Sequence, residues 1–271
     1  SNCVGVCGTH GKTTTTAMLT QMFIECGMDP SAVIGGKLEA IGGSGRLGNS
    51  EVMVCEACEF EDHFLKFHPD VAVVLNVDAD HMEYFKTMDH VLDSYHRFAA
   101  MATKAVIYNG DDANSCRAVQ GIEGVKLLCF GMGEDNDYHA CNIRHVDGRH
   151  TLYDLYYKQE RLGQVKLNVP GEHNVLNSMA AVAAAIESGC QTQRAVESVS
   201  AFQGAGRRFE IMGTNKGVTI ADDYGHHPAE IEVTLKAAKQ MGYRQVWAVH
   251  QPFTSVSYTH LRAHETELHL V

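Results

Sequence analysis

The distribution of apolar residues predicts that strands and helices alternate along the first half of the chain. Short apolar runs without a two-residue alternation are typical of strands that are covered on both faces, as in parallel sheets. Such runs are Cys3–Cys7, Val52–Cys55, Val71–Val77, Ala105–Tyr108 and Val125–Phe130. Over 15–27 and 90–102 the apolar residues recur at helical spacing instead. The alternation indicates an α/β protein whose parallel sheet is flanked by helices.

The pattern changes in the second half of the chain. Two-residue alternation at 151–156 and 165–169 predicts a small antiparallel sheet appended to the main one. An alanine-rich helix follows over 174–188, and its small side chains favour close packing. Runs at 217–221 and 245–249 predict two more strands. With the helix predicted between them over 228–241, they indicate the start of a second α/β domain.

Glycines mark two segments as irregular. The stretch 34–48 is rich in glycine and predicts a surface loop. Gly204-Ala205-Gly206 interrupts the last helical pattern and is a candidate hinge. We therefore expect a central domain over 1–211 and part of a second domain over 212–254.

Composition and charge narrow the classes of function. The chain has 271 residues, 45% of them hydrophobic, and its formal net charge is −11. This acidity argues against nucleic-acid binding, which needs a dense basic face. No apolar run approaches the roughly 20 residues of a membrane span. The nine cysteines are scattered and odd in number, which favours reduced thiols and a cytoplasmic location.

The segment between the first strand and the first helix carries the strongest motif. It reads Gly8-Thr9-His10-Gly11-Lys12-Thr13-Thr14. Glycines let successive amides point into one concavity, and the following helix start adds positive potential. Lys12 can neutralise phosphate oxygens and Thr13 can hold Mg²⁺. Five residues separate Gly5 from Gly11, one more than in the standard Walker A pattern. The motif thus predicts a variant P-loop that binds ATP or GTP; the alternative is an ordinary glycine turn before a helix.

This loop resembles the ATP loop of the Mur ligases, the amide ligases of peptidoglycan synthesis. Five further segments match motifs of that family in the same order: Glu56–Glu59, Asn76–His81, Pro170–Asn177, Phe202–Phe209 and Asp222–Pro228. His10, the Arg207-Arg208 pair and the string Asp-Asp-Tyr-Gly-His-His-Pro resemble the alanine-adding members in particular. The resemblance covers Val4 to Thr254 and implies a P-loop-type α/β fold.

The resemblance implies a reaction and a set of roles. ATP would phosphorylate a carboxylate to an acyl phosphate, which an amine then attacks. The implied substrates are UDP-N-acetylmuramate and L-alanine, and the implied cofactors are ATP and Mg²⁺. The implied catalytic residues are Lys12, Glu56, His81 and Arg208.

The binding roles are implied in the same way. Gly8 to Thr14 would hold the ATP phosphates, Thr13 and Glu56 one metal ion, and His81 a second. Arg208 would lie near the γ-phosphate and Asp223 near the ribose. The residues facing the adenine would be His173, Asn174 and Asn177. Those approaching the substrate would be Glu59, Tyr224, His226 and His227.

Each of these residues also has a purely structural interpretation. Glu56 can be a solvated strand end, His81 a surface or capping residue, and Arg207-Arg208 a surface ion pair. The spacing Cys55-x-x-Cys58 allows redox or zinc chemistry, and the pair His226-His227 allows zinc binding. No second cysteine pair of matching spacing supports either zinc site.

The chain departs from the family pattern at both ends. Mur ligases have three domains; we expect that the first, which binds the UDP-sugar, is missing before Val4, and that 212–254 is only the beginning of the third. The stretch 255–271 resembles translated adaptor sequence, although a genuine polar tail is the alternative. We therefore expect this chain alone to bind nucleotide without turnover. Other Mur-fold activities, murein peptide recycling or glutamate addition to folate, remain alternatives.

Overall fold

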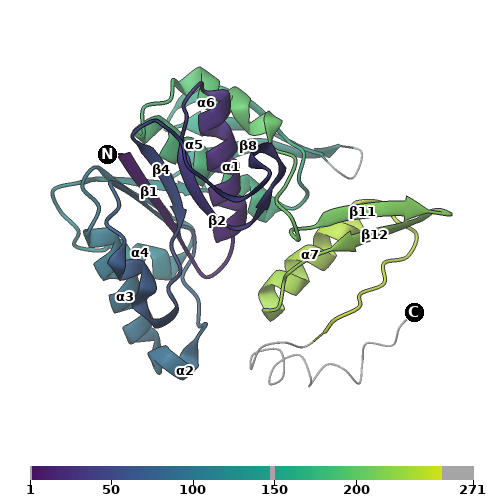
Figure 1. Cartoon of the computed structure of the whole chain (residues 1–271), viewed down its shortest axis with the longest axis horizontal. Coiled ribbons are helices and arrows are strands. Elements are labelled where there is room, and N and C mark those ends of the chain that lie inside the picture. Colours follow the sequence, from purple (N-terminus) through teal and green to yellow (C-terminus); the bar gives the residue numbers. More distant parts are fainter. Residues whose placement is uncertain (1, 147–149, 252–271) are drawn as a thin grey trace.

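The computed structural model describes residues 2–146 and 150–251, and a ten-stranded sheet dominates it (Figure 1). The strand order is β10-β9-β8-β7-β6-β5-β1-β4-β2-β3. The strands are β1 Asn2–Cys7, β2 Ser31–Leu38, β3 Gly43–Arg46, β4 Val52–Glu56, β5 Val71–Val74, β6 Ala105–Asn109, β7 Lys126–Gly131, β8 Tyr138–Val146, β9 His150–Tyr157 and β10 Glu160–Leu167. The five strands expected from apolar runs in the first half are thus confirmed.

The central strands run parallel, which brings their carboxyl ends to one edge of the sheet. β1 pairs in parallel with β4 and β5, and β5 with β6 and β6 with β7. Val4 and Val6 of β1 are completely buried, as expected for a central strand covered on both faces. Ligands of open α/β sheets bind at the carboxyl ends of such strands. Cys7, the last residue of β1, leads directly into the glycine-rich motif.

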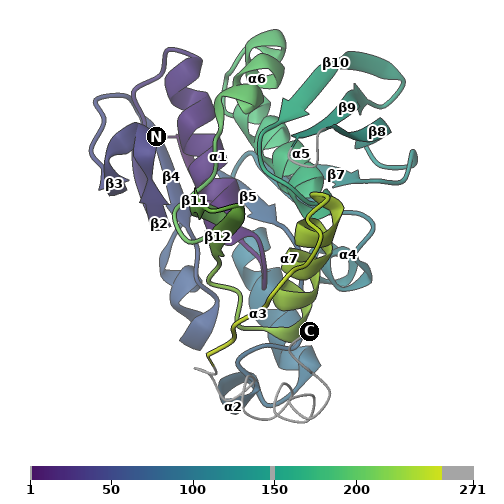
Figure 2. The same cartoon turned by 90° about the vertical axis from the view of Figure 1, so that its right-hand side faces the viewer.

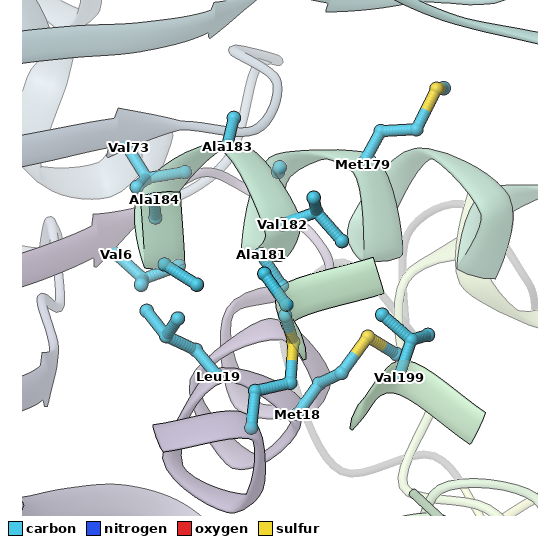
Figure 3. Close-up of a cluster of buried hydrophobic side chains, with 14 of the residues drawn as sticks. Val6, Met18, Leu19, Val73, Met179, Ala181, Val182, Ala183, Ala184 and Val199 are labelled. Atoms are coloured by element: carbon cyan, nitrogen blue, oxygen red, sulfur yellow. The ribbon is translucent and has the colours of Figure 1, made fainter. Parts of the chain in front are cut away.

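Helices cover both faces of the sheet, and the sheet separates two hydrophobic cores. One core contains α1 (Lys12–Glu25), α5 (Glu172–Glu187) and α6 (Thr192–Ser198). The other contains α3 (Met88–Ala100) and α4 (Ala113–Val119). Short helical turns complete these layers: α2 Met82–Phe85, η1 Glu39–Ile41, η2 Phe60–Lys66 and η3 Val199–Ala201. In Figure 3 the alanines of α5 approach Val6 and the α1 side chains Met18 and Leu19, the close packing that small residues permit.

The glycine-rich stretch 34–48 is not the loop that its composition predicts. β2 and β3 occupy most of it as an antiparallel pair, and β2 also pairs in parallel with β4. Glycine weakens a strand but is used where another group approaches the backbone closely. A Cβ on Gly35 would lie 2.5 Å from Glu56 Oε2, so the lack of a side chain there serves contact with the neighbouring strand.

The predicted antiparallel segment is confirmed, but it continues the main sheet. β8, β9 and β10 pair antiparallel with one another. β8 joins the parallel part through two residue pairs, Phe130 with Tyr138 and Gly131 with His139. The segment therefore extends one edge of the sheet.

A smaller unit follows the sheet. It consists of the hairpin β11 (Glu210–Asn215) and β12 (Val218–Asp222) and the helix α7 (Pro228–Gln240). Figures 1 and 2 show this unit beside the carboxyl-end region of the sheet. The strand predicted over 245–249 is wrong: this stretch pairs with no strand of the described residues, and Val249 is 95% exposed. An apolar run becomes a strand only where another strand is available to pair with it.

The segment 255–271 lies outside the described residues. Among the residues that are described, no helix combines the length and apolarity that crossing a bilayer requires.

Candidate nucleotide site

The glycine-rich motif forms a turn that the neighbouring strand end holds in place. Gly8 and Gly11 have φ angles of +147° and +87°, which glycine adopts most easily. Asn76, just past β5, holds the turn through two hydrogen bonds of its side-chain amide to the backbone of His10. The Asn76 Oδ1 accepts from the His10 N–H at 2.8 Å, and the Asn76 Nδ2 donates to the His10 carbonyl at 2.9 Å. The turn ends where α1 begins, so its amides and the positive end of α1 meet at one point.

Lys12 is held at the centre of this turn by a buried carboxylate. Its Nζ donates to the Gly8 carbonyl at 2.6 Å and lies 2.9 Å from Glu59, whose side chain is only 3% exposed. Burial alone would lower the pKa of Lys12, but the charge and hydrogen bond of Glu59 raise it above its ordinary value. The ammonium therefore stays charged and points into the turn.

Thr13, Glu56 and Arg208 meet beside Lys12. The Thr13 hydroxyl donates to Glu56 Oε1 at 3.1 Å and accepts from Arg208 Nη2 at 3.3 Å. A hydroxyl and a carboxylate at this distance from one another, at a helix N-terminus, fit the ligand preferences of Mg²⁺. The guanidinium beside them suits the recognition of phosphate oxygens. The structure thus brings together three residues that lie far apart in the sequence.

His81 lies in a second polar cluster, with Asp80 and Glu59. One ligand atom from each of the three residues lies within 4.8 Å of the others. His81 has a φ of +51°, and its ring packs at a tilt against that of Phe60, with the ring centres 4.8 Å apart. This donor set could hold a divalent cation. Glu59, which we expected near the substrate, therefore belongs to this cluster and also pairs with Lys12.

A cavity of about 230 Å³ opens beside the turn. Several residues predicted to bind the nucleotide line it: His10, Gly11, Thr14, His173, Asn174, Asn177, Arg208 and Asp223. Asn177 Nδ2 donates to Asn174 Oδ1 at 3.1 Å, and Asn174 Nδ2 donates to the Pro170 carbonyl at 2.6 Å. A Cβ on Gly11 would lie 2.6 Å from Asn177 Oδ1, so only glycine lets the turn approach α5 so closely.

The motif Asp222–Pro228 contributes unequally to the cavity. Asp223 lines it, and its carboxylate accepts from the Phe209 and Gly225 N–H groups, both at 2.8 Å. Tyr224, which is 43% exposed, lies outside the lining, with the Arg207 guanidinium 4.7 Å from its ring centre. His226 and His227 are not in the lining either, although the His227 ring lies 4.8 Å from that of His10.

Sequence reasoning missed two residues of the site, Asn76 as a clamp and Glu230. Glu230 lines the cavity, and its Oε2 accepts from the His226 and His227 N–H groups at 3.1 and 3.4 Å. Burial opposes its ionisation, but hydrogen bonding to His10 and the His10 charge lower the pKa of Glu230 to about 2. The sequence did contain a signal for Glu230. Pro228 is typical of the first position of a helix, which makes Glu230 the third, where the glutamate of a capping box accepts from the backbone N–H groups before the helix.

His173 gives the site a measurable dependence on pH. Burial lowers the pKa of His173 to about 4, well below the ordinary 6.5. Between these values the unfolded chain binds more protons than the folded chain, so the free energy of unfolding rises with pH. The contribution of His173 is complete above pH 6.5 and is lost as the pH falls to 4; it amounts to at most about 3 kcal/mol.

We therefore expect His173→Gln to flatten the increase in the free energy of unfolding between pH 4 and 6.5. Urea titrations across this range measure it. His68→Gln, at an exposed position, serves as the control. An unchanged slope in the His173 variant would contradict a neutral, buried imidazole.

Comparisons with known proteins agree with this geometry. The family model of the Mur ligase middle domain matches residues 6–185, and that of the Mur ligase glutamate ligase domain matches 207–264. UDP-N-acetylmuramate–L-alanine ligase of Caldanaerobacter subterraneus is 42% identical over 253 residues, which cover 93% of this chain and 55% of that protein. The chain thus spans about half the length of the curated relatives it matches.

Solved structures give the same result. The UDP-N-acetylmuramate–alanine ligase of Thermotoga maritima superposes with a TM-score of 0.78 at 27% identity, over 89% of this chain and 54% of that one. A murein peptide ligase of Psychrobacter arcticus gives 0.71 at 26% identity, over 93% and 58%. With a matching family model over most of its length and the motif geometry described above, the chain belongs to the Mur ligase family.

Proposed function

We propose that this chain carries the ATP-binding centre of a ligase that joins L-alanine to the carboxylate of UDP-N-acetylmuramate in the cytoplasm. The observation that carries the proposal is the meeting of Lys12, Thr13, Glu56 and Arg208 at the start of α1. Cationic, hydroxyl and carboxylate groups at a helix N-terminus are the groups that bind a nucleoside triphosphate together with its metal ion. The names of the similar curated proteins support the choice of substrates.

We assign one group of site residues to the phosphate end of the nucleotide and another to its base and ribose. The amides of Gly8 to Thr14 and the Lys12 ammonium would hold the phosphate chain. As the family resemblance implies, His173, Asn174 and Asn177 would face the base and Asp223 the ribose; the presence of all four in the lining of the cavity beside the turn supports these roles. Phosphoryl transfer depends mainly on positioning and charge neutralisation, which such rigid, buried contacts supply.

Mg²⁺ would be held by Thr13 and Glu56, and a second ion by His81 with its neighbours Asp80 and Glu59. The bound metal would neutralise charge on the transferred phosphate. Arg208, which donates a hydrogen bond to the Thr13 hydroxyl, would act on the same phosphate. The muramoyl carboxylate would take the phosphoryl group to form an acyl phosphate, and the amine of L-alanine would displace phosphate to form the amide. Tyr224, His226 and His227 remain candidates for contact with the substrate.

The proposal separates into binding and turnover, and two assays test it. This chain should bind ATP in the presence of Mg²⁺, as measured by calorimetry. The full-length gene product should release phosphate only when ATP, UDP-N-acetylmuramate and L-alanine are all present. Phosphate release with another amino acid but not with alanine would contradict the assignment, and ligation sustained by this chain alone would contradict our expectation that it binds without turnover.

A murein peptide ligase is the second candidate, because the solved structure of one superposes on 93% of this chain. A single substitution of the amine tests it. Replacing L-alanine with the tripeptide L-alanyl-γ-D-glutamyl-meso-diaminopimelate in the same assay should leave the background rate if the first proposal holds. Phosphate release with the tripeptide only would establish the second candidate.

A further inference from the structure

Glu230 connects the two units of the chain through a single carboxylate. It belongs to the first turn of α7, in the smaller unit, whereas His10 lies in the phosphate turn of the large sheet, 220 positions earlier. Glu230 Oε1 lies 3.1 Å from His10 Nδ1. Glu230 Oε2 accepts from the backbone N–H groups of His226 and His227, which precede α7. With a side-chain exposure of 17%, the carboxylate has little access to water.

The contact determines which nitrogen of His10 carries a proton. A carboxylate only accepts hydrogen bonds, so the facing Nδ1 must be protonated. The ring cannot turn freely, because the His10 backbone is held on both sides by Asn76 and its ring lies against that of His227. A carboxylate on one nitrogen of an imidazole generally fixes the role of the other.

Within the described residues, the second nitrogen of His10 is an unsatisfied polar atom of the site, as are Glu59 Oε2 and His173 Nδ1. His10 Nε2 is buried and has no hydrogen-bond partner within the described part of the chain. His10 itself borders the cavity, together with Arg208 and Glu230. A buried polar atom without a partner is costly, so its retention indicates a ligand group that satisfies it.

We propose that Glu230 is a positioning residue: it holds His10 with the proton on Nδ1, so that Nε2 faces the bound nucleotide, and thereby couples the docking of α7 to nucleotide binding. The inference rests on the proposed nucleotide function. It adds to the nucleotide site a residue outside the phosphate turn. Through this residue, the position of the smaller unit affects how the phosphates are bound. Docking of α7 against the sheet then favours nucleotide binding in the turn. Because such coupling is reciprocal, nucleotide binding favours the docking of α7 by the same free energy.

Calorimetric titration of this chain with Mg²⁺ and ATP tests the coupling. Glu230→Gln keeps the size of the side chain and removes its charge; we expect about tenfold weaker binding, typical of the loss of one charge-assisted contact. Glu232→Gln is the matched control, because Glu232 is on the same helix but 64% exposed and pairs only with Lys236 in the described contacts. This control should bind within about twofold of the parent chain, as surface substitutions usually do.

A double-mutant cycle with His10→Asn separates positioning from helix capping. If Glu230 acts through His10, Glu230→Gln adds no further loss of affinity in the His10→Asn chain. If Glu230 only caps α7, the loss is the same in both backgrounds, and the inference is overturned. An unaffected affinity in Glu230→Gln also overturns it. If the parent chain itself does not bind ATP, the proposed function fails, and the inference with it.

The tautomer of His10 gives a readout that does not depend on a variant that might misfold. Long-range ¹H–¹⁵N spectra of the parent chain at neutral pH, with the His10 signals assigned by their loss in His10→Asn, should show the proton on Nδ1. A proton found on Nε2 alone would overturn the inference whatever the affinities are.

Discussion

Lys12→Ala is expected to abolish nucleotide binding and to destabilise the fold at the same time. Removal of the ammonium takes away the charge that faces the phosphates and leaves the Glu59 carboxylate, which is 3% exposed, without its cationic partner. Breaking a buried ion pair from one side costs about 3–5 kcal/mol in the free energy of unfolding. We expect at least about a hundredfold loss of affinity for ATP with Mg²⁺, the order of magnitude of a lost charge contact to phosphate. Urea unfolding and calorimetry measure the two effects separately.

A second substitution separates these two effects of Lys12. In Lys12→Ala with Glu59→Gln, the orphaned charge is gone, so most of the lost stability should return. The affinity should not return, because nothing replaces the ammonium. If the double variant is as unstable as the single one, the destabilisation does not come from the buried carboxylate, and the interpretation of the Lys12–Glu59 pair is wrong.

Gly35→Ala is expected to impair the metal-dependent part of nucleotide binding. Its Cβ would lie 2.5 Å from Glu56 Oε2 and 2.6 Å from Oε1, closer than real contacts allow, so the carboxylate must leave its present position beside Thr13. The Gly35 N–H also donates to Glu56 Oε2 at 2.7 Å, and this hydrogen bond would lengthen. We expect about tenfold weaker binding of ATP with Mg²⁺, as for a misplaced ligand-holding group.

Gly43→Ala is the matched control for Gly35→Ala. Gly43 lies in the adjacent strand β3, and a Cβ there meets no atom within 4 Å. This variant should bind ATP with Mg²⁺ as the parent does. Titration of both variants with ATP in Mg²⁺ and in EDTA isolates the metal-dependent part; equal affinities of the Gly35 variant and the parent in Mg²⁺ would show that Glu56 does not need its present position.

The predictable part of the fold follows from local pattern. The buried strands β1 and β5 and the helix α5 were predicted because an apolar run or an alanine-rich stretch carries its signal within the segment itself. Strand β2 was not, because its glycines have low strand propensity and are favoured by close approaches from other elements, of Glu56 in β4 to Gly35 and of Thr13 in α1 to Gly36. The opposite error, at 245–249, has the same cause: whether an apolar run becomes a strand depends on a partner elsewhere in the chain.

The site was predictable where its members belong to contiguous motifs. Lys12 and Thr13 were identified from spacing, whereas the roles of Glu56 and Arg208 came from the family resemblance; the structure places them around one hydroxyl. Glu230 carries no such mark, because a glutamate in the first turn of a helix is common. Its contact with His10 joins positions 220 residues apart, which no local pattern encodes.

The segment that joins the two units has a consequence for how a nucleotide could leave. Gly206 N–H donates to the Lys37 carbonyl of β2 at 2.7 Å, and Arg208 reaches Thr13, so the segment is fastened to the sheet up to Arg208. Contacts to the other side begin at Arg207, whose carbonyl accepts from the Tyr224 N–H at 2.9 Å and whose Nε donates to Asp222 Oδ2 at 3.2 Å, and continue at Phe209, whose N–H donates to Asp223. The contacts to the two units therefore overlap at Arg207 and Arg208, since Arg207 bonds to the smaller unit and Arg208 to Thr13 beside the sheet. If the smaller unit moves away and takes Asp223 and Glu230 with it, either the bonds of Arg207 to Asp222 and Tyr224 or that of Arg208 to Thr13 must break, so opening the ribose side of the cavity has a cost beside the phosphate turn.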